Sequence, residues 1–229
     1  MNGEVKKSDL GVRTLSGIVM LLIFATAIGL GGWPFKILIG AVVAGLLFEW
    51  YRLASGIARG SIELVILAGI GLAYIGYAAW TLIVIREESL DLAVYPIAIV
   101  IATDVGAYFA GRTFGGPKIA PQISPSKTWS GLAGGMIAAA IVSAVSTEWL
   151  VLDDSYQLAL MGIFIAVGAA LAVFAQIGDF LESSMKRGAG VKDSGNLIPG
   201  HGGLLDRMDG LLAVLCIFGL LTFLLRGWE

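Results

Sequence analysis

The sequence predicts an all-α, polytopic integral membrane protein with seven to nine transmembrane helices and two polar loops on the cytoplasmic side. Of the 229 residues, 57% are hydrophobic and 14% are charged, whereas a soluble domain carries about 25% charged residues. Apolar runs long enough to cross a bilayer recur along the chain. The polar side chains concentrate in two segments between these runs, so we expect any chemistry to lie there.

Seven apolar segments reach the length of roughly 20 residues that a helical span requires. They cover about 14–32, 35–51, 62–86, 92–111, 130–150, 157–181 and 209–226. The third is ambiguous, since it fits one tilted helix or two shorter pieces broken near Gly71 or Gly76. Small residues at Gly134, Gly135 and Gly168 predict close helix packing. No linker interrupts the chain, so we expect one domain over 1–229, with N-terminal spans in 14–86 and a catalytic half in 92–226.

The ends and the single cysteine give further limits. The polar residues 1–13 precede an apolar run without a small-residue cleavage site, which predicts a retained first span instead of a removable signal peptide. Cys216 is the only cysteine and lies in an apolar run, so an intrachain disulfide is excluded. No long basic run is present, and this argues against nucleic-acid binding.

The distribution of Lys and Arg predicts the orientation. With seven spans and a cytoplasmic N-terminus, twelve of the fifteen Lys and Arg residues fall on the inner side, and only Lys36, Arg86 and Arg226 lie near outer ends. Cytoplasmic loops carry an excess of these residues. We therefore expect the polar loops 112–129 and 182–208 to face the cytoplasm.

The first polar region begins inside an apolar segment. Asp104 is an ionisable residue at membrane depth, which makes it a functional candidate. Tyr108 follows four residues later and shares its helix face. A structural pairing of Asp104 with Arg112 is the alternative.

A hydroxyl- and lysine-containing stretch follows, running from Ser124 through Lys127 and Thr128 to the next span. Free N–H groups at a helix N-terminus, together with hydroxyls and a lysine, suit a phosphate. Plain helix capping by Thr128 explains the same residues without a ligand.

The second polar region, 178–209, holds five acids, four bases and the only histidine. Asp206 and Asp209 are three residues apart and share a helix face, and Asp179 ends the preceding span. Carboxylates brought together need a cation between them, and oxygen ligands favour Mg²⁺ bridged to substrate phosphates. The remote Cys216 and the lone His201 exclude a thiolate zinc site. An ordinary cationic connector is the alternative reading.

His201 is flanked by Gly200, Gly202 and Gly203. A lone histidine in a glycine-rich loop is more often a hydrogen-bonding residue than a catalyst. We expect it to contact a ligand phosphate or to order the loop, and its role as a general base stays open.

The second region resembles the signature of phosphatidate cytidylyltransferases, also called CDP-diglyceride synthases. Its matching positions are Ser183, Met185, Lys186, Arg187, Lys192, Asp193, Gly195, Ile198, Pro199, His201, Gly202, Gly203, Leu204, Asp206, Arg207, Met208 and Asp209. The stretches around Asp104 and Lys127 also resemble the family, so the likeness covers about residues 100 to 210. Ser126 and Ser130 stand where family members often carry Lys and Glu. The family's eight or nine spans favour splitting 62–86.

The resemblance implies a reaction in which CTP and phosphatidic acid give CDP-diacylglycerol and pyrophosphate with Mg²⁺, a second cation being left open. It implies metal ligands at Asp179, Asp206 and Asp209. The catalytic set comprises these three with Lys186, Arg187 and Arg207. The substrate-binding set comprises Asp104, Tyr108, Arg112, Ser124, Lys127, Thr128, Ser183, Lys192, Asp193, His201, Gly202 and Gly203.

This reaction agrees with the residue types present. A lipid phosphate is already ionised, so the attack requires no strong general base, and the barrier between two polyanions calls for cationic clamps. The expected partners are CTP, phosphatidic acid and the lipid bilayer, with a homodimer left open. The expected location is the bacterial inner membrane, with the active site facing the cytoplasm.

Two other functions stay open, and the spacing of the acids argues against a third. Another CTP-using lipid enzyme, such as a polyprenol or phytol kinase or an archaeal-type lipid cytidylyltransferase, would share a metal site. A CDP-alcohol phosphotransferase spaces its acids differently from Asp206 and Asp209. An ion-coupled transporter could use Asp104 and Asp179 as intramembrane sites, although it would need its polar groups at mid-membrane.

Overall fold

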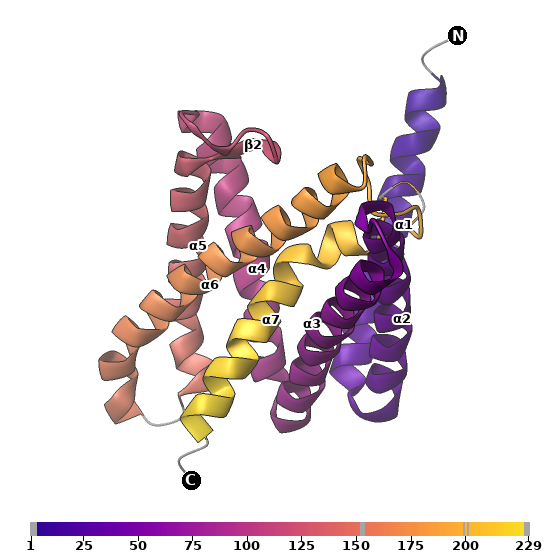
Figure 1. Ribbon diagram of the computed structural model, residues 1–229. Helices are drawn as coiled ribbons and strands as arrows, with labels where there is room; N and C mark the ends of the chain where they lie inside the picture. The colour runs from indigo at the N-terminus through magenta and orange to yellow at the C-terminus, as the bar shows by residue number, and fades with distance from the viewer. Residues whose placement is uncertain (1–3, 152–153, 199, 201, 227–229) are drawn as a thin grey trace. The chain divides into compact units, whose positions relative to one another are not determined.

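The computed structural model describes residues 4–151, 154–198, 200 and 202–226, in which seven helices and one small sheet form (Figure 1). In chain order these are α1 (Glu4–Leu30), α2 (Gly32–Ile57), α3 (Ser61–Glu88), α4 (Leu90–Phe114), β1 (Lys118–Ala120), β2 (Ser124–Thr128), α5 (Trp129–Leu150), α6 (Asp154–Gly188) and α7 (Leu205–Arg226). Each predicted span corresponds to one helix, which confirms the all-α class.

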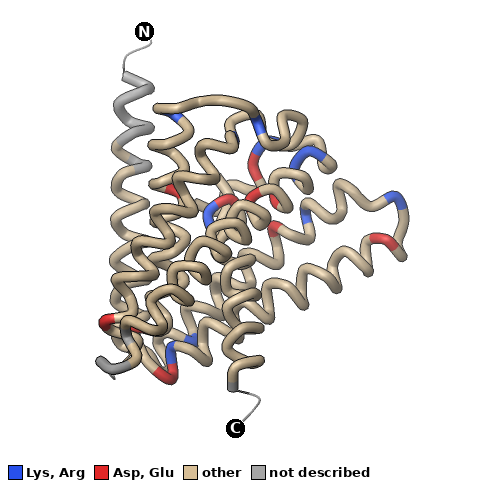
Figure 2. The backbone as a smooth tube through the Cα atoms, turned by 90° about the vertical axis from the view of Figure 1, so that its left-hand side faces the viewer, with Lys and Arg blue, Asp and Glu red and all other residues tan. Residues whose placement is uncertain are grey.

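Six of the described helices, α2 to α7, are long and apolar enough to cross a membrane, and α1 contains a shorter apolar stretch, Thr14–Leu30. Figure 2 shows long stretches of tube without a charged residue. Because apolar helices satisfy their own backbone hydrogen bonds, they are suited to a solvent without water. The prediction of a polytopic integral membrane protein is therefore confirmed.

The ambiguous segment 62–86 forms one continuous helix, α3. The split that the eight or nine spans of the family favoured is therefore wrong for this chain. At Gly71, a Cβ atom would collide with the indole ring of Trp50 on α2. This glycine thus permits close helix packing and does not end the helix.

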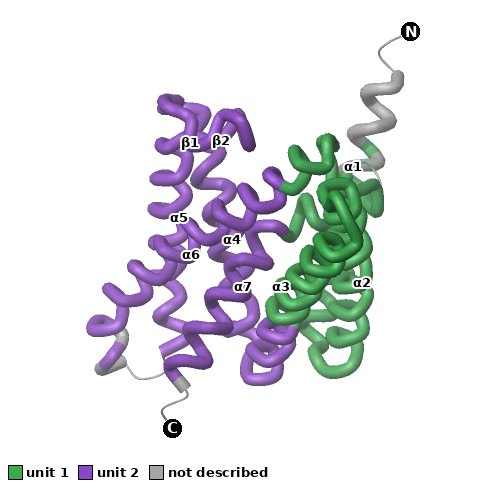
Figure 3. Tube along the Cα trace, viewed as in Figure 1, with its two compact units in different colours: residues 1–79, 185–208 green, residues 80–184, 209–229 purple. Residues whose placement is uncertain are grey.

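The chain divides into two compact units (Figure 3). Unit 1 comprises residues 1–79 and 185–208, and unit 2 comprises residues 80–184 and 209–229. Their boundaries fall within α3, α6 and α7. The single domain expected over 1–229 stays a prediction.

In unit 1, α2 and α3 are joined through Trp50. Its Nε1 donates a hydrogen bond to the carbonyl oxygen of Leu67 at 2.9 Å, and its ring lies 5.9 Å from that of Tyr74. Leu46 and Ala54 of α2 are also buried. This packing places the buried face of α2, which includes Glu49, inside unit 1.

In unit 2, glycines bring the helices together. A Cβ at Gly134 of α5 would collide with Ala110 of α4, and a Cβ at Gly135 would lie 2.9 Å from the carbonyl oxygen of Thr103. On α6, a Cβ at Gly168 would lie 2.8 Å from the carbonyl oxygen of Ala139. The close packing predicted for these three glycines is confirmed.

The two polar loops are shorter than predicted. Within 112–129, α4 continues to Phe114, and β1 pairs antiparallel with β2 to form a hairpin. Within 182–208, α6 continues through Gly188 and α7 begins at Leu205, which leaves 189–204 as the connection. Lys186 and Arg187 occupy the last turn of α6, where cations stabilise the helix dipole.

A glycine ends α6. Gly190 has a φ of 68°, its N–H donates to Arg187 O at 3.1 Å, and Val191 N–H donates to Lys186 O at 2.9 Å. This is a Schellman motif, which requires the left-handed conformation that glycine adopts readily. The chain therefore turns sharply into the polar connection.

Candidate active site

Unit 2 contains a cavity of about 480 Å³. Four elements line it, since the residues come from α4, the β1–β2 hairpin, α5 and α6. They are Asp104, Ala107, Tyr108, Gly111, Arg112, Ser126, Lys127, Thr128, Gly131, Leu132 and Gln176. Five of the predicted substrate-binding residues thus share one cavity, and they come from parts of the first polar region that are up to 24 residues apart.

The start of α5 fixes the wall formed by the hairpin. Thr128 is the N-cap residue, and its hydroxyl accepts a hydrogen bond from Gly131 N–H at 3.1 Å. The capping alternative is therefore confirmed for Thr128. Thr128 and its neighbour Lys127 both line the cavity. The cap therefore fixes the backbone next to Lys127 directly before the first turn of α5.

Lys127 forms an ion pair with Asp179 of α6. Asp104 and Asp209 interact electrostatically with both of these charges. The lysine thus lies among three carboxylates from three helices. We call Asp104, Lys127, Gln176, Asp179 and Asp209 the cavity cluster.

A glycine explains how α6 and α7 bring Asp179 and Asp209 together. A Cβ at Gly178 would collide with the carbonyl oxygen of Asp209 and would lie 2.8 Å from the Cβ of Ala213. Only glycine permits this approach without a shift of one helix. Gly178 therefore sets the spacing of the two carboxylates.

Arg112 and Tyr108 form a local pair on α4. Arg112 donates a hydrogen bond from Nη1 to the Tyr108 hydroxyl at 2.8 Å, and its guanidinium lies 5.9 Å from the ring centre. The structural pairing considered for Asp104 with Arg112 is thus replaced by a contact of Arg112 with Tyr108. The guanidinium stays exposed at the cavity.

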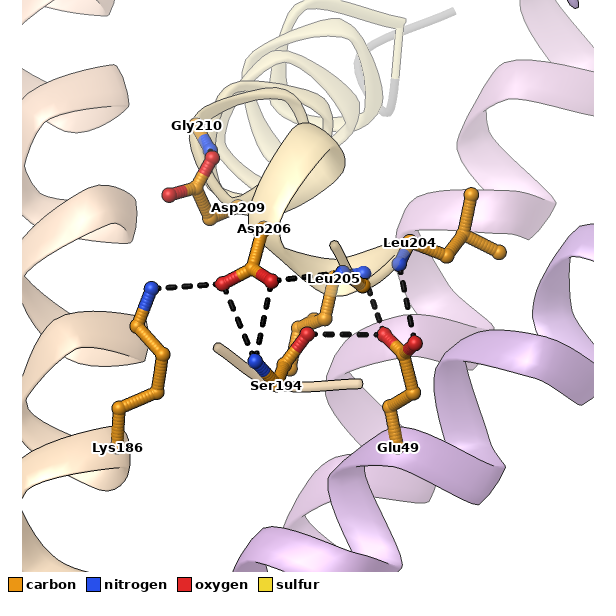
Figure 4. A network of polar contacts seen from close by, with 9 residues as sticks. Glu49, Lys186, Ser194, Leu204, Leu205, Asp206, Asp209 and Gly210 are labelled. Atoms are coloured by element: carbon orange, nitrogen blue, oxygen red, sulfur yellow. Dashed lines mark hydrogen bonds and ion pairs between the residues drawn. The ribbon is translucent and has the colours of Figure 1, made fainter. Parts of the chain in front are cut away.

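Unit 1 holds a second polar cluster, centred on Glu49 of α2 (Figure 4). This carboxylate is fully buried. Its oxygens accept hydrogen bonds from Ser194 Oγ at 3.0 Å, Leu204 N–H at 3.1 Å and Leu205 N–H at 2.8 Å. Glu49 therefore satisfies free N–H groups at the start of α7 from another helix. A Cβ at Gly203 would lie 2.8 Å from Glu49 Oε2, so that position requires glycine.

Asp206 belongs to the same cluster. Lys186 Nζ lies 2.7 Å from Asp206 Oδ1, and Oδ2 accepts hydrogen bonds from Ser194 N–H at 3.0 Å and Gly203 N–H at 2.9 Å. We call Glu49, Lys186, Ser194 and Asp206 the loop network. It ties the middle and the C-terminal end of the connection 189–204 to α2, α6 and α7 (Figure 4).

The remaining predicted residues divide by exposure. Arg187, Lys192, Asp193 and Arg207 are exposed, Ser183 is partly buried, and Ser124 is buried at the start of β2. Gly202 has a φ of 84° and pairs with Ile198 across the connection. His201 lies outside the described residues, so its role stays a prediction.

Asp179, Asp206 and Asp209 are the three predicted metal ligands. Within the described part of the chain, no group of three or more His, Cys, Asp or Glu side chains has the arrangement of a metal site. Asp179 and Asp209 lie in unit 2 and interact with each other, whereas Asp206 lies in unit 1. The convergence of all three on one cation therefore stays a prediction.

Two polar residues with clear structural positions, Glu49 and Gln176, were missed by the sequence reasoning. Both lie inside apolar runs, and the rule that an intramembrane polar residue marks a function applies to them as it does to Asp104. Applied evenly, that rule would have found both. Neither lies in the two polar regions, where most of the polar side chains of the sequence are grouped.

A family model and several curated relatives match most of this chain. The model of the cytidylyltransferase family matches residues 57–225. A phosphatidate cytidylyltransferase of Rickettsia bellii is 37% identical over 91% of this chain and 89% of its own length. That of Rickettsia conorii is 36% identical over 97% and 95%. That of Brucella suis is 41% identical, and there the match spans 65% of this chain and about half, 55%, of the relative.

The family match includes α4, the hairpin, α5, α6 and most of α7, and thus every residue of the cavity cluster. It covers well over half of the chain, and the Rickettsia relatives extend the likeness to nearly all of it. The chain belongs to the cytidylyltransferase family.

Proposed function

We propose that this chain transfers a cytidylyl group from CTP to phosphatidic acid and releases pyrophosphate. The observation that carries the proposal is the cavity cluster, in which a lysine lies among three carboxylates at a cavity between apolar helices. Relatives that align over nearly the whole chain bear the name phosphatidate cytidylyltransferase. This reaction needs a polar site next to the bilayer, because phosphatidic acid is a lipid and CTP is water-soluble.

In the reaction, a phosphate oxygen of phosphatidic acid attacks the α-phosphorus of CTP. A new P–O bond forms as the bond between the α-phosphorus and the bridging oxygen breaks, and that oxygen leaves with pyrophosphate. No proton has to be removed from the nucleophile. Lys127 and Arg112, which line the cavity, bind and orient the phosphate groups and lower the repulsion between the two anions.

The residues present suit Mg²⁺. This ion is commonly held by one or two carboxylates together with substrate phosphates and water. Asp179 and Asp209 supply two such carboxylates from neighbouring helices, and Asp206 is the third predicted ligand. The ion would neutralise charge on the phosphates of CTP. Titration of other cations at saturating Mg²⁺ tests the second cation that the resemblance left open.

A radiochemical assay tests the function. Purified protein, [α-³²P]CTP, Mg²⁺ and phosphatidic acid should give a labelled lipid that comigrates with CDP-diacylglycerol, with release of pyrophosphate. Parallel reactions contain a polyprenol, phytol or an archaeal-type ether lipid acceptor, and [γ-³²P]CTP detects kinase activity. Label transferred from the γ-position, or transfer only to another acceptor, would refute the proposal.

We further propose that the site faces the cytoplasm of a bacterial inner membrane, an orientation supported by the excess of Lys and Arg on that side. In a Cys216→Ser background, Ser126→Cys should react with an impermeant thiol reagent only in inside-out vesicles. Glu88 is the last residue of α3 and lies at the opposite end of α4 from the hairpin. Glu88→Cys should therefore react only in right-side-out vesicles. Crosslinking in the membrane tests the homodimer.

A further inference from the structure

Gln176 of α6 is a buried amide with an unmet hydrogen-bonding requirement. Gln176 is only 7% exposed. Its amide nitrogen, Nε2, has no hydrogen-bond partner among the residues that the structure describes. Most buried polar atoms in proteins are paired, because an unpaired donor costs free energy. An unpaired amide donor is therefore expected where a ligand supplies the acceptor.

The surroundings of Gln176 indicate what kind of ligand this is. Gln176 lines the cavity together with Lys127 and Arg112. The two cations suit the charged oxygens of a phosphate. The neutral amide suits a neutral acceptor, such as a carbonyl oxygen. A ligand that fits this cavity thus carries a phosphate and, a short distance away, an uncharged oxygen.

The position of Gln176 along α6 sets the order of these two groups. Gln176 precedes Asp179, the partner of Lys127, by three residues, which is a rise of about 4.5 Å along the helix. The nearer end of the apolar span is Gly188, so Gln176 lies deeper in that span than the ion pair. In a phospholipid, the ester carbonyls lie on the acyl side of the phosphate, and hence also deeper in the bilayer.

We propose that the Gln176 amide donates a hydrogen bond to an ester carbonyl of phosphatidic acid while Lys127 binds its phosphate. This inference rests on the proposed function and assigns Gln176 to the lipid and not to the nucleotide. It makes Gln176 a specificity residue, since a lipid with ether-linked chains has the same phosphate but lacks the carbonyl. The enzyme should therefore prefer ester-linked phosphatidic acid.

Two lipids that differ only in this oxygen provide the test. The wild-type protein and Gln176→Leu are assayed in mixed micelles with ester-linked and ether-linked phosphatidic acids of the same chain length. We expect the wild type to favour the ester lipid in kcat/KM by about 3- to 10-fold, the usual worth of one hydrogen bond. In Gln176→Leu this ratio should fall to about 1, with the KM for CTP unchanged. Gln176→Met serves as the second variant if the leucine protein cannot be purified.

A matched control is available in unit 2. Thr81 is also buried, and its Oγ1 has no hydrogen-bond partner in the described part of the chain, but it lines a different cavity. Thr81→Val should retain the ester preference. Gln176→Leu should unfold at the same temperature as the wild type or higher, because it removes an unpaired buried donor.

Three kinetic results would overturn the inference. They are a wild type without ester preference, an unchanged preference in Gln176→Leu, and a loss that appears in the KM for CTP. A markedly lower unfolding temperature for Gln176→Leu would show a structural amide and would also overturn it. Failure of the proposed function gives a different result, since the folded wild type would then make CDP-lipid from neither phosphatidic acid.

Discussion

The loop network of unit 1 and the cavity cluster of unit 2 both bring polar side chains together from apolar helices, but they differ in how fully those groups are paired. In the loop network, both oxygens of Glu49 and both oxygens of Asp206 accept hydrogen bonds. In the cavity cluster, the amide nitrogen of Gln176 has no partner in the described structure, and the carboxylates repel one another around one lysine.

The difference in pairing indicates that the polar residues of the two clusters have different roles. A fully paired network stabilises the backbone that it ties together, and a ligand would have to break existing contacts to enter it. An incompletely paired cluster beside a cavity gains partners when a charged ligand binds. We therefore expect substitution of Glu49 in the first cluster to reduce stability and substitutions in the second cluster to reduce activity.

Asp209→Asn should have the largest effect. The described contact of its carboxylate is with Gly210 N–H at 2.8 Å, which an amide oxygen can still accept. Folding should therefore persist, while loss of a metal-binding charge should lower cytidylyl transfer by about 1,000-fold, or ~4 kcal/mol. The measurement is the rate at saturating Mg²⁺. The exposed Asp91→Asn is the control, and near-native activity of Asp209→Asn would mean that the carboxylate is structural.

Glu49→Ala should mainly reduce stability. It leaves the Ser194 hydroxyl and the N–H groups of Leu204 and Leu205 without their acceptor, at a cost on the order of 3 kcal/mol. Glu49→Gln should cost less, because its amide oxygen still accepts. Thermal unfolding in detergent measures both.

Glu63→Ala is the control for this prediction. It removes an exposed carboxylate that accepts a hydrogen bond from Arg59 N–H and should cost about 1 kcal/mol. Equal unfolding temperatures for Glu49→Ala and the wild type would contradict the comparison.

Lys127→Gln should lower kcat/KM by roughly 10- to 100-fold, since it removes the cation that the cavity carboxylates surround. Stability should fall as well, because the carboxylates lose the cation that they surround. The loss of activity is therefore measured well below the unfolding temperature of the variant. Lys118→Gln is the matched control from the same hairpin, where the exposed Lys118 donates to Ser126 O at 3.3 Å. A similar loss of activity in both variants would show a general effect of charge instead of a specific contact.

Gly178→Ala should have the smallest of these effects. The added methyl group pushes α6 away from the Asp209 backbone, at about 1–2 kcal/mol of stability, and separates Asp179 from Asp209. The apparent Mg²⁺ affinity should fall with it. Gly162→Ala on the same helix meets nothing within 4 Å and should be neutral. If Gly178→Ala also retains native Mg²⁺ dependence, the close helix approach is not needed for the site.

Part of the site could be predicted from the sequence because the polar residues are rare and grouped. Asp104, Tyr108, Arg112, Lys127 and Thr128 were all expected to bind substrate, and all line the cavity. The role of Glu49 could not be predicted, since its partners lie about 150 residues away. Gln176 is visibly polar in the sequence, but only the packing showed that it is buried and that its amide nitrogen has no partner in the described structure.

The sequence by itself determined the membrane class, the seven helical segments and the family, because hydropathy and short motifs are local properties of the chain. Tertiary structure decided that 62–86 is one helix, that Glu49 secures the start of α7, and that Gln176 reaches the same cavity as Lys127. These outcomes depend on which helix faces meet, and in apolar spans many faces have nearly the same hydropathy. Close-packing glycines such as Gly178 and the pairing of buried polar groups select among them.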